Sequence, residues 1–111
     1  MAENIRDVFY ISEQGITRYV SPGYMEIWGR TPQSLYQDSK SILDTVHPKD
    51  KDRVMRSFPK RSREEVEEVY RIVRPDGSIR WIKDRSFPIY DDSGKTRRVV
   101  GIAADITDLK L

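Results

Sequence analysis

Cysteine is absent from this sequence of 111 residues, and histidine occurs once, as His47. Without cysteine the chain forms no disulfide, no thiolate metal site, no cysteine nucleophile and no covalent adduct between a cysteine and a cofactor. A single histidine also excludes a metal site built from several histidines of one chain. The absence of cysteine fits a reducing compartment, and we therefore expect a cytoplasmic protein.

Long apolar runs and a marked excess of either charge are also missing. No stretch approaches the roughly 18 apolar residues that a membrane span needs, and the N-terminus lacks the basic and apolar regions of a signal peptide. The 20 basic and 18 acidic residues leave a net charge of +2. The basic residues between Arg53 and Arg63 are followed at once by glutamates between Glu64 and Glu68. We therefore expect neither membrane insertion in this segment nor a nucleic-acid partner.

The strongest local signal lies around Pro75-Asp76-Gly77. Proline presets the backbone angle φ for a turn, aspartate closes the turn with its side chain, and glycine accepts the left-handed conformation. Runs rich in β-branched and aromatic residues flank this tripeptide on both sides. Alternation along the first run places Tyr70 and Ile72 on one face and Arg71 on the other. This pattern predicts a β-hairpin.

Other regions alternate in the same way. Residues 6–12 and 16–20 flank a turn at 13–15 and predict a first hairpin, and residues 97–106 predict a last long strand. Pro88 cannot donate to a sheet ladder, so an irregularity or an unpaired side is expected there. The strands and helical patterns are grouped rather than alternating. The sequence therefore predicts a single α+β domain, with a five-stranded antiparallel sheet and several short helices packed on one face.

The helical patterns begin at residues that suit helix starts. Ser21 and Thr31, each followed by proline, are expected to cap the first helices. Pro48 opens a later helix, in which Asp50 and Asp52 bring negative charge to the positive end of the helix dipole and are expected to be solvated. Residues two apart on a helix point to different sides, so these carboxylates do not converge on a metal ion.

In this order and at this spacing, several short segments resemble the PAS domain family, in the sensor type that carries a PAC segment. They are Tyr19-Val20-Ser21-Pro22, Trp28-Gly29-Arg30-Thr31-Pro32, Val46-His47-Pro48-Lys49-Asp50, Arg74-Pro75-Asp76-Gly77-Ser78-Ile79-Arg80-Trp81, and Gly101 through Asp105-Ile106-Thr107. The resemblance implies a PAS fold with the sheet order 2-1-5-4-3 and a core of about residues 7–107 within a single domain, 1–111. It also implies a non-catalytic sensory or regulatory domain that is a fragment of a longer multidomain protein.

The resemblance also bears on cofactors. Haem-binding members take an axial histidine from within the helix that here begins at Pro48, and that helix offers none, so His47 is expected to cap or pack its loop. Light-sensing members form a flavin adduct through a cysteine, and they place a glutamine where this chain has Ala103. Haem and a covalently bound flavin are therefore not expected, which leaves a non-covalent flavin or an unidentified small molecule. Ser21, Ser34 and Ser78 have no histidine–carboxylate partner set in the sequence, so neither a catalytic site nor a metal site is predicted.

Small residues on the last strand predict a cavity. Gly101 and Ala103 are expected to face the helices, as the matched positions of the family do, and to leave space that opposing side chains, solvent or a ligand must fill. Larger apolar residues of the helices and of another strand are expected to lie opposite. The predicted pocket is lined by Gly101 and Ala103 together with Ile27, Leu43, Val54 and Ile72.

Near the end of the chain, Asp105-Ile106-Thr107 resembles the family's aspartate–x–threonine terminus. There the two polar side chains tie down the strand and lead into a helix that carries the signal onward, so Asp105 and Thr107 are the predicted signal-transmission residues. The downstream effector is expected to be a diguanylate cyclase or, second, a histidine kinase, controlled by ligand binding or by rearrangement of a homodimer. The alternative is a ligand-free scaffold for dimerisation or protein interaction.

Overall fold

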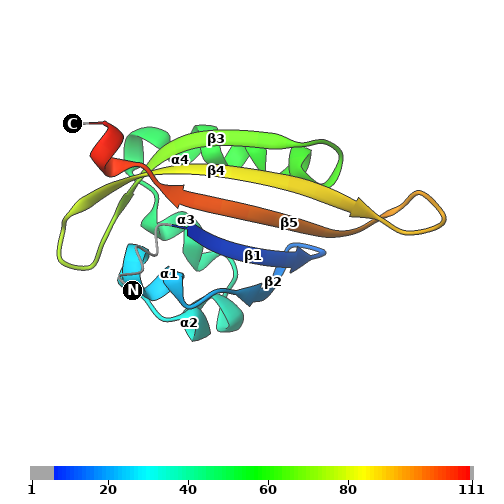
Figure 1. Cartoon of the computed structure of the whole chain (residues 1–111), viewed down its shortest axis with the longest axis horizontal. Helices are drawn as coiled ribbons and strands as arrows, with labels where there is room; N and C mark the ends of the chain where they lie inside the picture. The colour runs from blue at the N-terminus through cyan, green and yellow to red at the C-terminus, as the bar shows by residue number, and fades with distance from the viewer. Residues whose placement is uncertain (1–6, 111) are drawn as a thin grey trace, which may run out of the picture.

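The computed structural model describes residues 7–110 as one sheet with helices on one of its faces (Figure 1). The strands are β1 (Asp7–Glu13), β2 (Ile16–Val20), β3 (Val66–Val73), β4 (Ile79–Tyr90) and β5 (Thr96–Asp105). The α-helices are α1 (Gly23–Trp28), α2 (Pro32–Gln37), α3 (Ser41–Thr45) and α4 (Pro48–Ser57), and the 3-10 helices are η1 (Pro59–Ser62) and η2 (Thr107–Leu109). The sheet order is β2-β1-β5-β4-β3 with antiparallel neighbours, which confirms the predicted fold class and strand order.

The long strand β5 joins the two halves of the sheet. It pairs with β1 at Tyr10↔Gly101 and Val8↔Ala103, and with β4 at Asp84↔Ala103. Directly paired residues share a face, and side chains two apart on a strand point the same way. These five residues therefore lie on one face of the sheet. That face carries the helices, because Val8, Asp84 and Ala103 are all buried there.

The hairpin of β3 and β4 forms as the sequence predicts. Arg74 N–H donates to the Ser78 carbonyl at 2.8 Å, and Gly77 N–H donates to the Arg74 carbonyl at 2.8 Å. Asp76 Oδ1 accepts from Ser78 N–H at 2.9 Å, and Gly77 has the left-handed φ of 87° that the turn requires. Further along β4, Pro88 pairs with β5 only, because β4 runs past the end of β3. The expected unpaired side is confirmed.

The predicted capping residue is confirmed for α2 and wrong for α1. Thr31 caps α2 as predicted, and its hydroxyl accepts from Ser34 N–H at 3.3 Å. The prediction that Ser21 caps α1 is wrong, because no side chain caps that helix. Ser21 N–H instead donates to the Phe9 carbonyl at 2.8 Å, and its hydroxyl accepts from Phe9 N–H at 2.9 Å. By pairing with β1, Ser21 satisfies the backbone N–H and carbonyl groups of Phe9, which lie beyond the β1–β2 ladder.

Helix α4 closes the outer edge of β3, where a sheet would otherwise expose unpaired backbone groups. His47 N–H donates to the Arg71 carbonyl, and Arg53 NH2 donates to the Val69 carbonyl, both at 2.8 Å. Asp50 Oδ2 accepts from Arg71 N–H at 2.8 Å, and the Arg71 guanidinium pairs with both Asp50 oxygens at 2.9 and 2.8 Å. Asp50 is only 7% exposed, so the prediction that it is solvated is wrong. Its partner lies 21 residues away on a strand.

The core lies between the sheet and the helices. Tyr24, Ile72 and Ile82 are among its largest fully buried side chains. Tyr24 and Trp28 of α1 stack on one another with ring centroids 5.0 Å apart. The helices that cover this core are short, and none within residues 7–110 combines the length and apolar character needed to cross a membrane.

Candidate functional site

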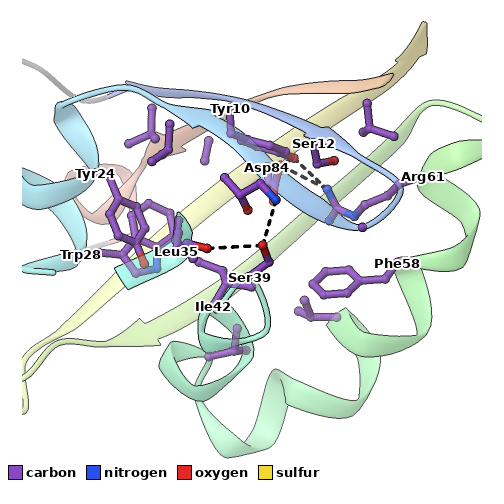
Figure 2. A pocket seen from close by; sticks show the side chains of 18 of the residues that line it. Tyr10, Ser12, Tyr24, Trp28, Leu35, Ser39, Ile42, Phe58, Arg61 and Asp84 are labelled. Carbon is purple, nitrogen blue, oxygen red and sulfur yellow. Dashed lines mark hydrogen bonds and ion pairs between the residues drawn. The ribbon is translucent and has the colours of Figure 1, made fainter. Parts of the chain in front are cut away.

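A cavity of about 220 Å³ lies between the sheet and the helices (Figure 2). Its walls are mostly apolar. The sheet contributes Val8, Tyr10, Val20, Tyr70, Asp84, Val99 and Ala103, and the helical side contributes Tyr24, Trp28, Leu35, Ile42, Val46, Val54, Phe58 and Arg61. The remaining lining residues are Ser12, Gly15, Thr17, Ser39 and Ser62. Because an apolar cavity of about 150 Å³ holds benzene, this one has room for a small organic molecule.

The ring of Tyr10 defines one wall of the cavity, and Gly101 makes room for that ring. A Cβ atom at Gly101 would lie 2.0 Å from Tyr10 Cζ and 2.3 Å from its hydroxyl oxygen. The space left by this glycine is therefore filled by Tyr10 of the neighbouring strand. Ala103, two residues further on, does line the cavity.

Of the six residues predicted to line a pocket, the structure places two in the cavity lining and four outside it. Val54 and Ala103 line the cavity. Ile27 and Ile72 are buried in the core cluster, Leu43 packs against that cluster, and the space at Gly101 is occupied by Tyr10, so these four stand outside the lining. The lining also includes Phe58 at the end of α4 and Arg61 and Ser62 of η1, which the predicted set lacks.

A buried polar cluster forms one end of the cavity, and we call its members Tyr10, Arg61, Tyr70 and Asp84 the polar cluster. The Tyr10 hydroxyl donates to Asp84 Oδ1 at 2.6 Å, and the Tyr70 hydroxyl donates to Asp84 Oδ2 at 3.0 Å. Arg61 NH1 donates to the Tyr10 hydroxyl at 2.9 Å and lies 3.4 Å from Asp84 Oδ1. Figure 2 shows Arg61 directed at Tyr10 and Asp84. The cluster thus connects η1 to β1, β3 and β4.

Burial keeps the tyrosines of the polar cluster protonated. Burial, together with the neighbouring Asp84 charge, raises the pKa of Tyr10 and of Tyr70 well above the ordinary value. Burial, the largest single effect, acts to lower the pKa of Arg61, but the neighbouring groups together, Asp84 first among them, outweigh it and raise the pKa. At neutral pH the tyrosines are therefore hydrogen-bond donors and Arg61 is a cation.

Sequence reasoning missed the polar cluster, although one signal for it exists. Asp84 stands two residues from the buried Ile82 on β4, at an inward-facing position where a charged side chain needs a partner. Arg61 stands in a run of basic residues and carries no local sign of burial, yet it is 7% exposed. The hydroxyl of Tyr10 that it binds lies 51 residues earlier in the chain.

The predicted signal-transmission residues join the end of β5 to β4. Thr107 N–H and its hydroxyl both donate to Asp105 Oδ1, at 3.0 and 2.5 Å. The Thr107 hydroxyl oxygen accepts from Trp81 N–H at 2.9 Å, and Ile106 N–H donates to the Trp81 carbonyl at 2.9 Å. Asp105 also lies 3.6 Å from Arg80 NH1. These contacts hold the last strand against its neighbour where the chain passes into η2.

Trp81 connects the edge of the sheet that α4 covers with the segment where the chain passes from β5 into η2. The Arg71 guanidinium lies 5.1 Å from the centroid of the Trp81 ring, and Lys110 Nζ lies 5.0 Å from it. Because Arg71 also holds Asp50 of α4, a continuous set of contacts leads from α4 to η2.

His47 has the structural role that the sequence predicts. It occupies the N-cap position of α4, and its Nδ1 accepts from Lys49 N–H at 3.1 Å, which confirms the capping interpretation. Among residues 7–110, the acidic and histidine side chains form no group of three or more that could hold a metal ion.

Comparison with known proteins agrees with this architecture. A family model described as the PAS fold matches residues 17–103. The protein y4lL of Sinorhizobium fredii is 33% identical over 103 residues, which make up 91% of this chain and 12% of that protein. The N-terminal domain of a diguanylate cyclase with PAS/PAC sensor from Marinobacter aquaeolei has a TM-score of 0.85 and 24% identity, covering 96% of this chain and 100% of that one.

A sensory box histidine kinase/response regulator from Burkholderia thailandensis has a TM-score of 0.71 and 25% identity, covering 94% of this chain and 79% of that one. PAS domains are found in histidine kinases and diguanylate cyclases, where they are generally non-catalytic sensors. The family match spans most of the sheet and every α-helix, and the sheet order is that of the PAS fold. This chain therefore belongs to the PAS family.

Proposed function

We propose that the chain is a cytoplasmic sensory module that binds a small organic molecule in the cavity and controls a downstream effector. One observation supports this most directly: the cavity of about 220 Å³ combines apolar walls with a buried polar cluster at one end. Apolar walls with a few placed polar groups are typical of small-molecule sites.

The proposed signal path begins at α4. Val54 lines the cavity from this helix, and Phe58 lines it immediately after the helix ends. One turn earlier, Asp50 is held by Arg71, whose guanidinium packs on Trp81. A ligand that favours one position of α4 would shift the contacts of Trp81 with Lys110 and Thr107. Such a shift requires that the ligand bind the two arrangements with different affinity.

A diguanylate cyclase is the effector we propose first, and a histidine kinase second. The structural similarity to the sensor domain from Marinobacter aquaeolei covers all of that chain, and its TM-score of 0.85 exceeds the 0.71 of the histidine kinase from Burkholderia thailandensis. Asp105 and Thr107 are proposed to transmit the signal to the effector, acting within a homodimer.

Native mass spectrometry of the chain, purified from cells without denaturation, tests the proposal. A retained small molecule, released on denaturation, is the expected result. The matched control is Ala103→Leu, which fills the cavity from β5 and is expected to remove the additional mass. A bare chain mass in both proteins would oppose ligand sensing.

A second candidate function is a ligand-free dimerisation scaffold, and the outer face of the sheet favours it. On that face Ile11 pairs with both Tyr19 and Val100, and Val100 pairs with Phe87, so a row of apolar side chains crosses four strands. Phe9 and Ile102 continue this apolar patch, and they are 56% and 37% exposed. Large exposed apolar patches mark interaction sites.

A further inference from the structure

The charges that line the cavity cancel. Among the described lining residues, Arg61 is the one cation and Asp84 the one carboxylate, and each side chain is 9% exposed. Their closest atoms, NH1 and Oδ1, lie 3.4 Å apart. The lining tyrosines Tyr10, Tyr24 and Tyr70 are held in the neutral form by burial, which raises the pKa of all three. The cavity therefore presents no net charge to a ligand.

The N–H groups of Arg61 outnumber the contacts that the polar cluster and Ser57 make with them. Each oxygen of Asp84 already accepts a hydrogen bond from a tyrosine. An arginine has five N–H groups, and Arg61 directs contacts from NH1 to Tyr10 and Asp84 and from Nε and NH2 to the Ser57 hydroxyl, the last two at 3.4 Å. At least one N–H of Arg61 is left over. A ligand that supplies an acceptor oxygen would satisfy it.

The remaining lining suits a ring. Tyr24, Trp28 and Phe58 supply aromatic surface, and Leu35, Ile42 and Val54 supply aliphatic surface. The cavity volume of about 220 Å³ exceeds that of an apolar cavity of roughly 150 Å³ that binds benzene. One aromatic ring with a short substituent fits this space.

We propose that the cavity takes an uncharged aromatic compound with an acceptor oxygen, such as a ketone or an amide, and discriminates against the matching carboxylate. This inference rests on the proposed ligand-sensing function and specifies its ligand class. A carboxylate would add a negative charge beside Arg61, whose own charge is already paired with Asp84. A buried charge without a partner is strongly unfavourable.

Three probes that share a benzene ring test this assignment: acetophenone, benzoate and ethylbenzene. Binding to the wild-type chain is measured at pH 7 by ligand-observed NMR titration, and methyl shifts of Val54 and Ala103 locate the probe in the cavity. Acetophenone is expected to bind at least about tenfold more tightly than benzoate, and also more tightly than ethylbenzene. Equal or tighter binding of benzoate by the wild-type chain would overturn the assignment.

The substitution Asp84→Asn sharpens the test, because it removes the negative charge and keeps an acceptor oxygen. Arg61 then lacks a counter-charge, and benzoate is expected to overtake acetophenone. Glu67→Gln on the exposed side of β3 is the matched control and is expected to leave the ranking unchanged. An unchanged ranking in Asp84→Asn would also contradict the proposal. If that variant does not fold, the wild-type ranking decides alone.

Failure of this inference and failure of the proposed function are distinguishable. If native mass spectrometry finds a retained molecule but none of the three probes binds, the ligand class is wrong and sensing stands. If no molecule is retained and no probe binds, the proposed sensing function fails with it.

Discussion

The methyl group of an alanine at position 101 would overlap the Tyr10 ring, with its Cβ 2.0 Å from Tyr10 Cζ. The ring cannot turn away freely, because its hydroxyl donates to Asp84 and accepts from Arg61 inside the protein. Gly101→Ala is therefore expected to lower the free energy of unfolding by about 3 kcal/mol, as overpacking does. Urea denaturation followed by circular dichroism measures the change.

The control for this prediction is Tyr10→Phe, which frees the ring from both hydrogen bonds. In that background the ring can move, so Gly101→Ala is expected to cost at least about 1 kcal/mol less than in the wild type. Equal costs in the two backgrounds would show that the tether on Tyr10 does not restrain the ring.

Asp50 makes the stability of the protein depend on acidity. Its hydrogen bonds with the Arg71 side chain, despite the opposing effect of burial, lower the pKa of Asp50 from 3.8 to about 2. A carboxyl group whose pKa is lower in the folded state stabilises that state above its unfolded pKa, and this contribution is lost as the pH falls toward about 2. The contribution at neutral pH is about 2 kcal/mol.

Between pH 5 and 2.5, roughly the range in which an acidic group with these pKa values titrates, the wild type is expected to lose more stability than Asp50→Asn. Urea midpoints at several pH values give the difference. Asp52→Asn, which changes an exposed carboxylate on the same helix, is the matched control and should follow the wild type. Parallel curves for wild type and Asp50→Asn would contradict the prediction.

At the scale of elements, the strands and turns could be predicted because their signals are local. Pro75, Asp76 and Gly77 are enough by themselves to predict their turn. The alternation of side chains along the flanking strands predicts which face of the sheet each residue occupies. The cap at Thr31 is equally local, since its partner Ser34 lies three residues away. In both cases the residues that determine the structure are near neighbours in the chain, and the predictions there are confirmed.

The buried charges could not be predicted in the same way. Asp50 and Arg61 stand in charged, helix-forming sequence, and their burial depends on partners that the sheet brings to them from 21 and 51 residues away. The filling of the space at Gly101 could not be predicted for the same reason, because the side chain that fills it, Tyr10, comes from another strand. Small residues indicate where room exists, but only the cross-strand partner decides whether that room stays open.

The junction between β4 and η2 depends on one hydroxyl group. Thr107→Val removes both the acceptor for Trp81 N–H and the donor to Asp105. The Trp81 amide is expected to exchange with solvent about tenfold faster, corresponding to about 1.4 kcal/mol of lost protection. Amide hydrogen exchange by NMR measures this rate. Thr107→Ser keeps the hydroxyl and should restore slow exchange, and no difference between the two variants would oppose a tethering role.

For the whole molecule, the proposed dimerisation through the outer face of the sheet gives a further prediction. Wild-type protein is expected to dimerise with rising concentration, and Ile102→Lys should make it monomeric by placing a charge in the apolar patch. Sedimentation velocity distinguishes the two states. Met55→Lys on α4, 44% exposed and away from the sheet face, is the matched control and should still dimerise. Dimers that persist in Ile102→Lys would place the interface elsewhere.

The positions of the two tryptophans give the protein a pair of built-in optical reporters. Trp28 lines the cavity. Trp81 lies near η2, and its ring contacts the cations Arg71 and Lys110. Replacing either one by phenylalanine leaves a single tryptophan, so occupancy of the cavity and rearrangement near η2 become separately visible by tryptophan fluorescence. Since the chain has no cysteine, one introduced thiol would also accept a single acceptor dye for distance measurements between these two points.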